Sequence, residues 1–197
     1  MFESILLYHA HIICIQSMKK VIGIIGPIGV GKDTCAEYIA KKTGAGHFQI
    51  SQPIKDIALS KGLSTTRETL IEIGRTISQE KGPTYLAEYI LDQINSIGII
   101  TGMRMLEQID FLRKNSDFFL ISIDADPKTR FERVKDRGKL GEADSLEEFI
   151  ERERLENSGT VQRLFECMKL ADYSIMNNGT IKDLSSSIDE ILEKQGL

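Results

Sequence analysis

One glycine-rich segment carries the residue types best suited to chemistry in this chain. Residues 26–33 read GPIGVGKD and fit the pattern GxxxxGK. Glycines in a turn let successive backbone N–H groups converge on a phosphate, and the N-terminus of a following helix adds partial positive charge. We therefore predict a nucleotide-phosphate loop in which Lys32 reaches the β- and γ-phosphates. The alternative interpretation is a tight turn between a strand and a helix, with Lys32 merely exposed.

Asp33 follows the lysine at the position where most such loops carry serine or threonine, and Thr34 comes next. The usual hydroxyl ligates Mg²⁺. Because Mg²⁺ prefers hard oxygen ligands, a carboxylate can also hold the ion, directly or through water. We therefore predict Mg²⁺ as a cofactor that accompanies the nucleotide, with Asp33 and Thr34 at the metal. The residues predicted to contact the nucleotide here are Gly26, Pro27, Ile28, Gly29, Val30, Gly31, Lys32, Asp33 and Thr34.

Arg104 follows a second apolar run, IGIIT, at residues 97–101. Ligands of α/β proteins bind at the carboxyl ends of parallel strands, which is where Arg104 is expected to lie. An arginine there can hold a transferring phosphate through a bidentate fork. The alternative is a helix-capping ion pair with Glu107, and both interpretations can hold together.

Strand-type and helical patterns alternate along the chain. The run at residues 21–26, VIGIIG, is rich in β-branched residues, which is typical of a strand buried on both faces of a parallel sheet. The alternation predicts an α/β fold with a mostly parallel sheet and helices on both faces. The other strand-type runs are 47–51, 97–101, 118–124 and 173–176, and the helical patterns are roughly 33–43, 53–61, 66–80, 84–95, 105–114, 127–137, 145–155, 159–170 and 180–194.

The patterns predict a single domain over residues 18–197. Two helical insertions interrupt it, at about 53–95 and at about 138–160. Residues 1–17 are apolar, but they lack the basic start of a signal peptide and are shorter than the roughly 20 residues of a membrane span. We expect an N-terminal extension outside the core fold, and the alternative is an extra edge strand or helix.

The net charge and the cysteine content limit the kinds of partner that the protein can bind. The formal charge of −4 and a pI near 5.5 argue against a general nucleic-acid or membrane-surface binder, which normally has a basic excess. Three widely spaced cysteines without a CxxC pair suggest neither a disulfide framework nor a zinc site. We expect a cytoplasmic protein, a monomer or small homo-oligomer, that acts on a small molecule.

The sequence also argues against two classes of nucleotide-binding protein. A GTPase would carry an NKxD guanine motif and a DxxG switch, and neither is present. An AAA-type motor would show an apolar strand that ends in Asp-Glu, and neither 97–101 nor 118–124 ends that way.

Several motifs resemble those of P-loop kinases. GPIGVGKDTCAEYIA (26–40) resembles the loop of dephospho-CoA kinases, and its Gly-Lys-Asp-Thr is similar to that of deoxynucleoside monophosphate kinases and animal phosphomevalonate kinases. Residues 53–55 with 67–75 resemble the acceptor-binding region of the deoxynucleotide kinases, and residues 101–114 resemble their third-strand segment. DPKTRFERVKDRG, followed later by ADYSIMNNG (171–179), is similar to the lid and last strand of dephospho-CoA kinases and of archaeal adenylate-kinase-like proteins. The resemblance covers about residues 19–194.

This resemblance implies the fold of a nucleoside monophosphate kinase-like protein with a small helical lid. It implies a phosphotransferase that moves the γ-phosphoryl group of MgATP to a nucleotide-type acceptor, either a nucleoside or deoxynucleoside monophosphate or dephospho-CoA. Arg104, Arg67 and Lys55 would meet the phosphate of the acceptor. Asn178 follows the last strand, where the adenine pocket of the family lies, although a plain turn explains Asn-Asn-Gly equally well.

Three lid arginines share one face of the helical pattern after Pro127. Arg130, Arg133 and Arg137 are spaced i, i+3 and i+7. In the nucleotide kinases the corresponding arginines close over the γ-phosphate and exclude water, and Arg133 and Arg137 are favoured here as nearer the lid. The alternative is a solvated face paired with neighbouring acidic residues.

Two departures from the resemblance concern carboxylates. Thr101 stands where many relatives have Asp, and Ser51-Gln52 stand where dephospho-CoA kinases place acidic residues. Transfer to a phosphate oxygen needs no general base, whereas transfer to an alcohol benefits from one. The missing carboxylates therefore favour a nucleoside monophosphate acceptor. The preference is modest, because Asp33 or Glu107 could serve as a base for an alcohol acceptor.

The alternative function is an ATP-binding regulatory protein or weak ATPase without a metabolite acceptor. Thr101 supports it, and so does the acidic lid segment with Glu142, Asp144, Glu147, Glu148, Glu151 and Glu153.

Overall fold

The structure is a computed structural model that describes residues 18–138, 145–157 and 163–197. The predicted extension at residues 1–17 lies outside the described residues, and so does part of the predicted lid at about 138–160. Within the three described ranges, no helix combines the length and the apolar character needed to cross a bilayer.

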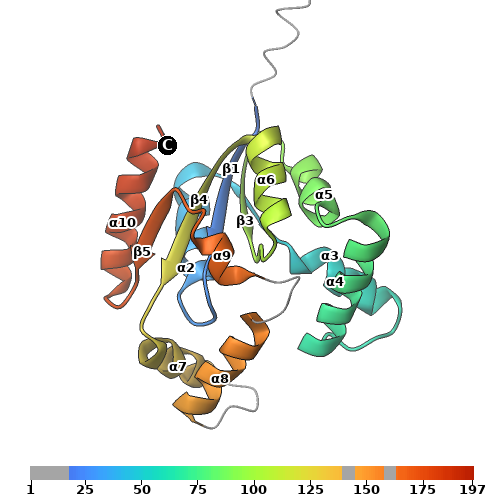
Figure 1. Ribbon diagram of the computed structural model, residues 1–197. Coiled ribbons are helices and arrows are strands. Elements are labelled where there is room, and N and C mark those ends of the chain that lie inside the picture. The colour runs from blue at the N-terminus through green and yellow to red at the C-terminus, as the bar shows by residue number, and fades with distance from the viewer. Residues whose placement is uncertain (1–17, 139–144, 158–162) are drawn as a thin grey trace, which may run out of the picture.

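One sheet of five parallel strands forms the centre of the fold (Figure 1). The strand order is β2-β3-β1-β4-β5, so β1 lies in the middle between β3 and β4. The predicted α/β fold is confirmed, and each predicted strand is present within a few residues of its expected bounds. The strands are β1 (Lys20–Ile25), β2 (Gly46–Gln49), β3 (Ile97–Thr101), β4 (Asp117–Asp124) and β5 (Tyr173–Met176).

The apolar sequence of β1 follows from its central place. Ile22 of β1 pairs with Ile99 of β3 in the parallel ladder. Because successive side chains point to opposite faces of a sheet, Val21 and Ile25 enter one core, and Ile22 and Ile24 enter the other. A central parallel strand needs apolar side chains on both faces, as the sequence pattern predicts.

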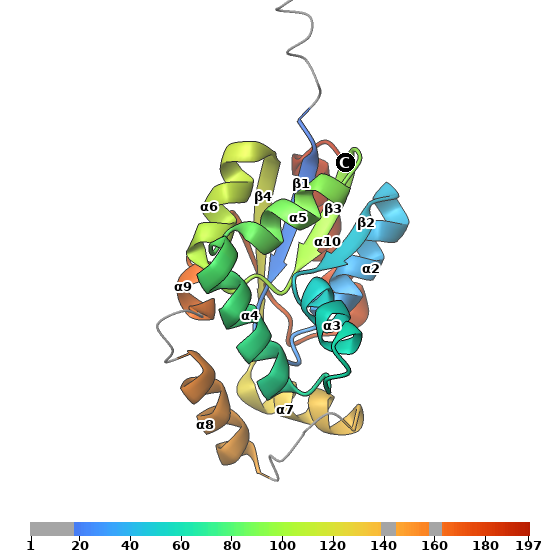
Figure 2. The same ribbon diagram turned by 90° about the vertical axis from the view of Figure 1, so that its right-hand side faces the viewer.

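Helices cover both faces of the sheet (Figures 1 and 2). Helices α2 and α10 pack on one face, and α5, α6 and α9 pack on the other. The helix predicted at about 159–170 is shorter in the described residues, because only α9 is helical there and 158–162 lie outside them. The helices are α2 (Lys32–Thr43), α3 (Ser51–Ser60), α4 (Arg67–Lys81), α5 (Tyr85–Gln93), α6 (Leu106–Asn115), α7 (Pro127–Asp136), α8 (Leu146–Asn157), α9 (Leu164–Met168) and α10 (Ile181–Lys194).

Two helix pairs extend beyond the sheet. Helices α3 and α4 pack together to one side, and α7 and α8 pack together beyond the carboxyl ends of the strands (Figures 1 and 2). The rings of Phe131 on α7 and Phe149 on α8 meet edge to face, with centroids 5.7 Å apart. With the buried Val134, they form a small apolar cluster of their own. The α7–α8 pair is thus held by its own core.

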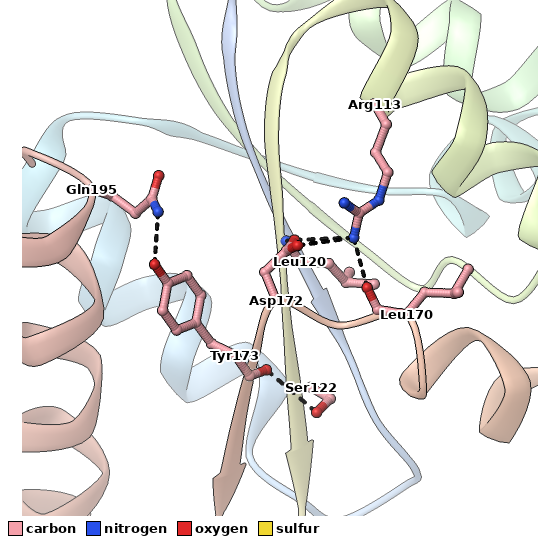
Figure 3. A network of polar contacts seen from close by, with 7 residues as sticks. All are labelled: Arg113, Leu120, Ser122, Leu170, Asp172, Tyr173 and Gln195. Carbon is pink, nitrogen blue, oxygen red and sulfur yellow. Dashed lines mark hydrogen bonds and ion pairs between the residues drawn. The ribbon is translucent and has the colours of Figure 1, made fainter.

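A polar network fixes β5 beside β4 (Figure 3). The carboxylate of Asp172 accepts hydrogen bonds from the backbone N–H of Leu120 at 2.8 Å and from Arg113 at 3.1 Å. On the other side, Gln195 donates to the hydroxyl of Tyr173 at 2.8 Å. These contacts hold the start of β5 against β4 on one side and against the segment after α10 on the other.

Candidate functional site

The loop between β1 and α2 has the backbone geometry of a phosphate cradle. Gly29 and Gly31 adopt left-handed conformations, with φ of 84° and 94°. A Cβ at Gly29 would lie 2.7 Å from the carbonyl oxygen of Arg130, and a Cβ at Gly31 would lie 2.9 Å from the side-chain nitrogen of Asn177. Both positions therefore require glycine, for conformation and for space.

Lys32 begins α2 at the end of this loop. Its ammonium group donates to the carbonyl oxygens of Gly26 at 2.8 Å and Pro27 at 2.7 Å, so the side chain folds back over the loop. The pKa of the amine is lowered from 10.5 to about 8, chiefly by burial and next by the positive charge of Arg104. Asp33 opposes this shift. A bound phosphate would supply the negative charge that this crowded cation lacks.

Arg130, on α7, is the one of the three predicted lid arginines whose charge acts on this amine. Its positive charge further lowers the pKa of Lys32, and the negative charge of Glu153 on α8 raises it. Arg130 is buried, its Nε donates to the carbonyl oxygen of Ala125 at 3.0 Å, and both terminal nitrogens donate to Glu153 at 2.6 and 2.8 Å. The sequence favoured Arg133 and Arg137 over Arg130, and it gave no sign of this pair because the partners are 23 residues apart.

Arg133 and Arg137 lie in different surroundings. Arg133 donates to the carbonyl oxygen of Asn177 at 2.8 Å and to that of Gly179 at 3.4 Å. It therefore ties α7 to the segment after β5. Arg137 caps the carboxyl end of α7, where it is exposed, and its side chain has no hydrogen bond or ion pair to the residues that the structure describes.

The two asparagines after β5 contact different segments. Asn177 is buried and donates from its side chain to the carbonyl oxygen of Val30 in the loop, at 2.8 Å. Asn178, the predicted adenine contact, accepts from the backbone N–H of Asp126 at 2.8 Å and donates to its carboxylate at 2.9 Å. Asn178 thus holds the start of α7, and Asn177 is a loop contact that only the tertiary structure shows.

Arg104 lies in the segment that joins β3 to α6. The segment follows β3, the neighbour of β1 in the sheet, and the positive charge of Arg104 lowers the pKa of Lys32. The backbone of Arg104 is held on both sides, because its N–H donates to Gln108 and its carbonyl oxygen accepts from the N–H of Arg163 at 2.9 Å. Glu107, the alternative partner considered for Arg104, lies 3.5 Å from Arg163 in an ion pair.

The remaining predicted acceptor residues lie on α3 and α4. Lys55 lines a cleft of about 460 Å³ between β2, α3 and α5, with the aromatic Phe48 and Tyr89 among its other lining residues. No residue of the 26–33 loop lines this cleft. Arg67 is the first residue of α4.

Asp33 and Thr34 occupy the first turn of α2, next to Lys32. In the described part of the chain, no group of three or more His, Cys, Asp or Glu side chains could hold a metal alone. Magnesium in nucleotide sites needs only one or two protein oxygens, since phosphates and water supply the rest. The oxygen donors of Asp33 and Thr34 therefore fit Mg²⁺ that arrives with a nucleotide.

Curated proteins similar in sequence to this chain are UPF0200 proteins of archaea. A UPF0200/UPF0201 protein of Archaeoglobus fulgidus is 30% identical over an alignment of 183 residues that covers 89% of this chain and 55% of that protein. A UPF0200 protein of Hyperthermus butylicus is 26% identical over an alignment of 180 residues that covers 89% of this chain and 95% of that protein. The chain thus spans about half the length of the first relative and nearly all of the second.

Solved structures show the same fold. Shikimate kinase from Acinetobacter baumannii, in complex with shikimate, superposes with a TM-score of 0.57 at 14% identity, covering 93% of this chain and 98% of that one. TT1252 from Thermus thermophilus superposes with a TM-score of 0.62 at 20% identity, covering 90% of this chain and 98% of that one. The P-loop kinase fold is therefore confirmed. The finer resemblance to dephospho-CoA kinases or adenylate-kinase-like proteins stays a prediction, because the sequence relatives are UPF0200 proteins.

A family model covers the part of the chain that contains the phosphate loop and strands β3 and β4. Strand β3 ends in Thr101 before Gly102, and β4 ends in Asp124 before Ala125, so neither of these strands carries the acidic pair expected of an AAA-type motor. A family model nevertheless matches residues 22–156, which are more than half of the chain. The chain belongs to this family, AAA_18, described as an AAA domain.

Proposed function

We propose that the protein is an ATP-dependent kinase that transfers the γ-phosphoryl group of MgATP to a nucleotide-type acceptor. The observation that carries the proposal is the glycine loop after β1, over which Lys32 folds and against which the backbone of Arg130 packs. The positive charges of Arg104 and Arg130 also act on the amine of Lys32, although the three cations come from α2, the β3–α6 segment and α7. Phosphoryl transfer is catalysed mainly by positioning and by neutralisation of charge on the phosphates, and this arrangement supplies both.

On the donor side, the loop backbone and Lys32 would hold the β- and γ-phosphates. The lowered pKa of Lys32 means that the amine gains stabilisation as a cation when a phosphate arrives. Asp33 and Thr34 would hold Mg²⁺, which when bound neutralises charge on the phosphate oxygens. Asn178 is proposed to border the adenine, next to its contact with Asp126.

On the acceptor side, Arg104 would bind the phosphate that receives the transferred group. An arginine can grip two phosphate oxygens at once, which orients the acceptor for in-line attack. We propose Lys55 and Arg67 as further contacts to the acceptor. Arg133 and Arg137 are proposed to help close the lid over the transferring group, which excludes water.

The surroundings of Thr101 favour a phosphate oxygen as the nucleophile. Its side chain is 3% exposed, and its hydroxyl is hydrogen-bonded to His47 at 2.9 Å. No carboxylate stands at this position to accept a proton from an alcohol. A phosphate oxygen is already ionised at neutral pH, so a nucleoside or deoxynucleoside monophosphate fits better than dephospho-CoA.

The same observation favours a second candidate function, an ATP-binding regulatory protein or weak ATPase. A site with threonine in place of a carboxylate at position 101 can bind and slowly hydrolyse ATP while no metabolite accepts the phosphate. The two functions differ in one property, which is whether an acceptor accelerates ADP formation.

The test is ADP formation from MgATP against a panel of acceptors. The panel holds ribo- and deoxynucleoside monophosphates, dephospho-CoA, phosphomevalonate and, as an alcohol acceptor taken from the fold relatives, shikimate. We expect one phosphate acceptor to raise the rate, and Lys32→Ala to abolish that rise. Lys41→Ala, an exposed lysine on the same helix, is the matched control and should behave as wild type. If no acceptor raises the rate while ATP still binds, the regulatory function replaces the kinase.

A further inference from the structure

Glu153 is a buried carboxylate that the proposed reaction does not use. It lies on α8, and its side chain is 12% exposed. It accepts hydrogen bonds from both terminal nitrogens of Arg130, at 2.6 and 2.8 Å, in a bidentate pair. The remaining edge of that guanidinium donates to the carbonyl oxygen of Ala125. The face of Arg130 that would grip two oxygens of a phosphate is therefore taken by Glu153.

The backbone of Arg130 packs against the phosphate loop. The carbonyl oxygen of Arg130 would be 2.7 Å from a Cβ at Gly29, so the first turn of α7 packs against the loop backbone. The charges of Arg130 and Glu153 both act on the amine of Lys32, in opposite directions. The carboxylate of Glu153 thus pairs with the arginine whose helix packs on the loop, and its charge acts on the amine of Lys32.

The packing of α8 on α7 holds the carboxylate there. Phe149 of α8 lies under the guanidinium of Arg130, with the charge 5.6 Å from the ring centroid, and against the ring of Phe131. The apolar cluster between the two helices is limited to Val134, Phe149 and the partly buried Phe131 among the described residues. Movement of Glu153 away from Arg130 would therefore disturb few apolar contacts.

A carboxylate and a phosphate offer an arginine the same two-oxygen fork, but the phosphate carries more charge. We propose that Glu153 is a specificity-determining residue that occupies Arg130 in the nucleotide-free protein and is displaced by the terminal phosphate of a polyphosphate ligand. A ligand without a β- or γ-phosphate cannot compete for Arg130. The inference rests on the proposed nucleotide site, and not on which acceptor, if any, receives the phosphate.

The test is the affinity of Glu153→Gln for MgATP and for inorganic tripolyphosphate, measured by titration calorimetry with no acceptor present. Removing the internal competitor should tighten both by about tenfold, as expected when Arg130 is otherwise occupied about nine-tenths of the time. Glu151→Gln is the matched control, since Glu151 is a carboxylate on the same helix that pairs with Arg154 on the surface. Unchanged or weaker binding by Glu153→Gln would overturn the proposal and make Glu153 a residue that merely positions Arg130.

A second measurement keeps the proposal falsifiable if Glu153→Gln does not fold. The chain has no tryptophan, so Phe149→Trp gives a single reporter at the α7–α8 contact while Glu153 is retained. Tripolyphosphate should shift its emission to the red as the contact opens. No shift at saturation would contradict displacement. Because neither assay contains an acceptor, failure of the kinase proposal leaves these outcomes unaffected.

Discussion

The side chain of Asn177 donates a hydrogen bond to the backbone carbonyl of Val30 at 2.8 Å. Arg133 in turn donates to the carbonyl oxygen of Asn177 at the same distance. Three segments that are remote in the sequence, the phosphate loop, the exit of β5 and helix α7, are thus joined through one buried asparagine. The glycine at position 31 leaves the room that the asparagine needs.

Asn177→Ala should lower the free energy of unfolding by about 1–3 kcal/mol, because the carbonyl of Val30 loses its donor in a buried place. Urea unfolding measures the loss. Asn178→Ala is the control, since the hydrogen bonds of Asn178 to Asp126 are exposed and their loss leaves groups that water can satisfy. Equal losses in the two variants would show that the contact with Val30 is not special.

Binding of ATP near pH 9 should take up most of one proton. The pKa of Lys32 is about 8 in the free protein, so its amine is mostly neutral at that pH, and a phosphate raises the pKa and restores the charge. In the free protein, the unfolded chain holds more protons between pH 8 and the ordinary pKa of 10.5, so Lys32 makes stability rise with pH across that window.

Calorimetry in buffers of different ionisation enthalpy measures this proton uptake. Lys32→Met should lose it, and should also lose the rise in stability, while Lys41→Met should keep both. Proton release on binding, or uptake that persists in Lys32→Met, would assign the titration to another group.

Arg104→Ala should slow phosphoryl transfer by on the order of 10²–10³-fold, as for other preorganised donors to a developing charge. Affinity for MgATP should change little, because Arg104 is assigned to the acceptor. Turnover is compared with ATP binding measured separately. Loss of ATP binding with a preserved fold would move Arg104 to the donor side.

Asp33→Asn should raise the Mg²⁺ concentration needed for half-maximal ADP formation by about 10–100-fold, the range found when a group that supports a metal is removed. The amide keeps the size of the side chain and removes its charge. A Mg²⁺ titration at fixed ATP measures the shift. An unchanged midpoint in Asp33→Asn would leave Thr34 as the protein ligand.

The central fold could be predicted because its signals are local. Ile22 and Ile24 point to one face and Val21 and Ile25 to the other, and such a run has few uses besides a central parallel strand. The phosphate loop could be predicted for the same reason, since its glycines and Lys32 are neighbours in the chain. A site built from neighbouring residues can be recognised from their order and spacing in the sequence.

The contacts of the arginines on α7 could not be predicted, because their partners are distant in the sequence. Arg130 and Glu153 are both charged residues on helices, and each is as well suited to a solvated surface as to a buried pair. Periodicity placed Arg130, Arg133 and Arg137 on one face, but only packing decides that Arg130 meets Glu153 and Arg133 meets Asn177. The cleft beside Lys55 likewise arises from β2, α3 and α5 together.

The most direct test of the central claim follows the γ-phosphate itself. ATP labelled on that phosphate is incubated with the protein and each acceptor, and the products are separated into labelled acceptor and free phosphate. The account predicts that label moves to one phosphate acceptor, and that Lys32→Ala slows the transfer by about 10²–10³-fold, a loss of about 2.7–4 kcal/mol of transition-state stabilisation. Label found only in free phosphate, at a rate that no acceptor changes, would contradict it.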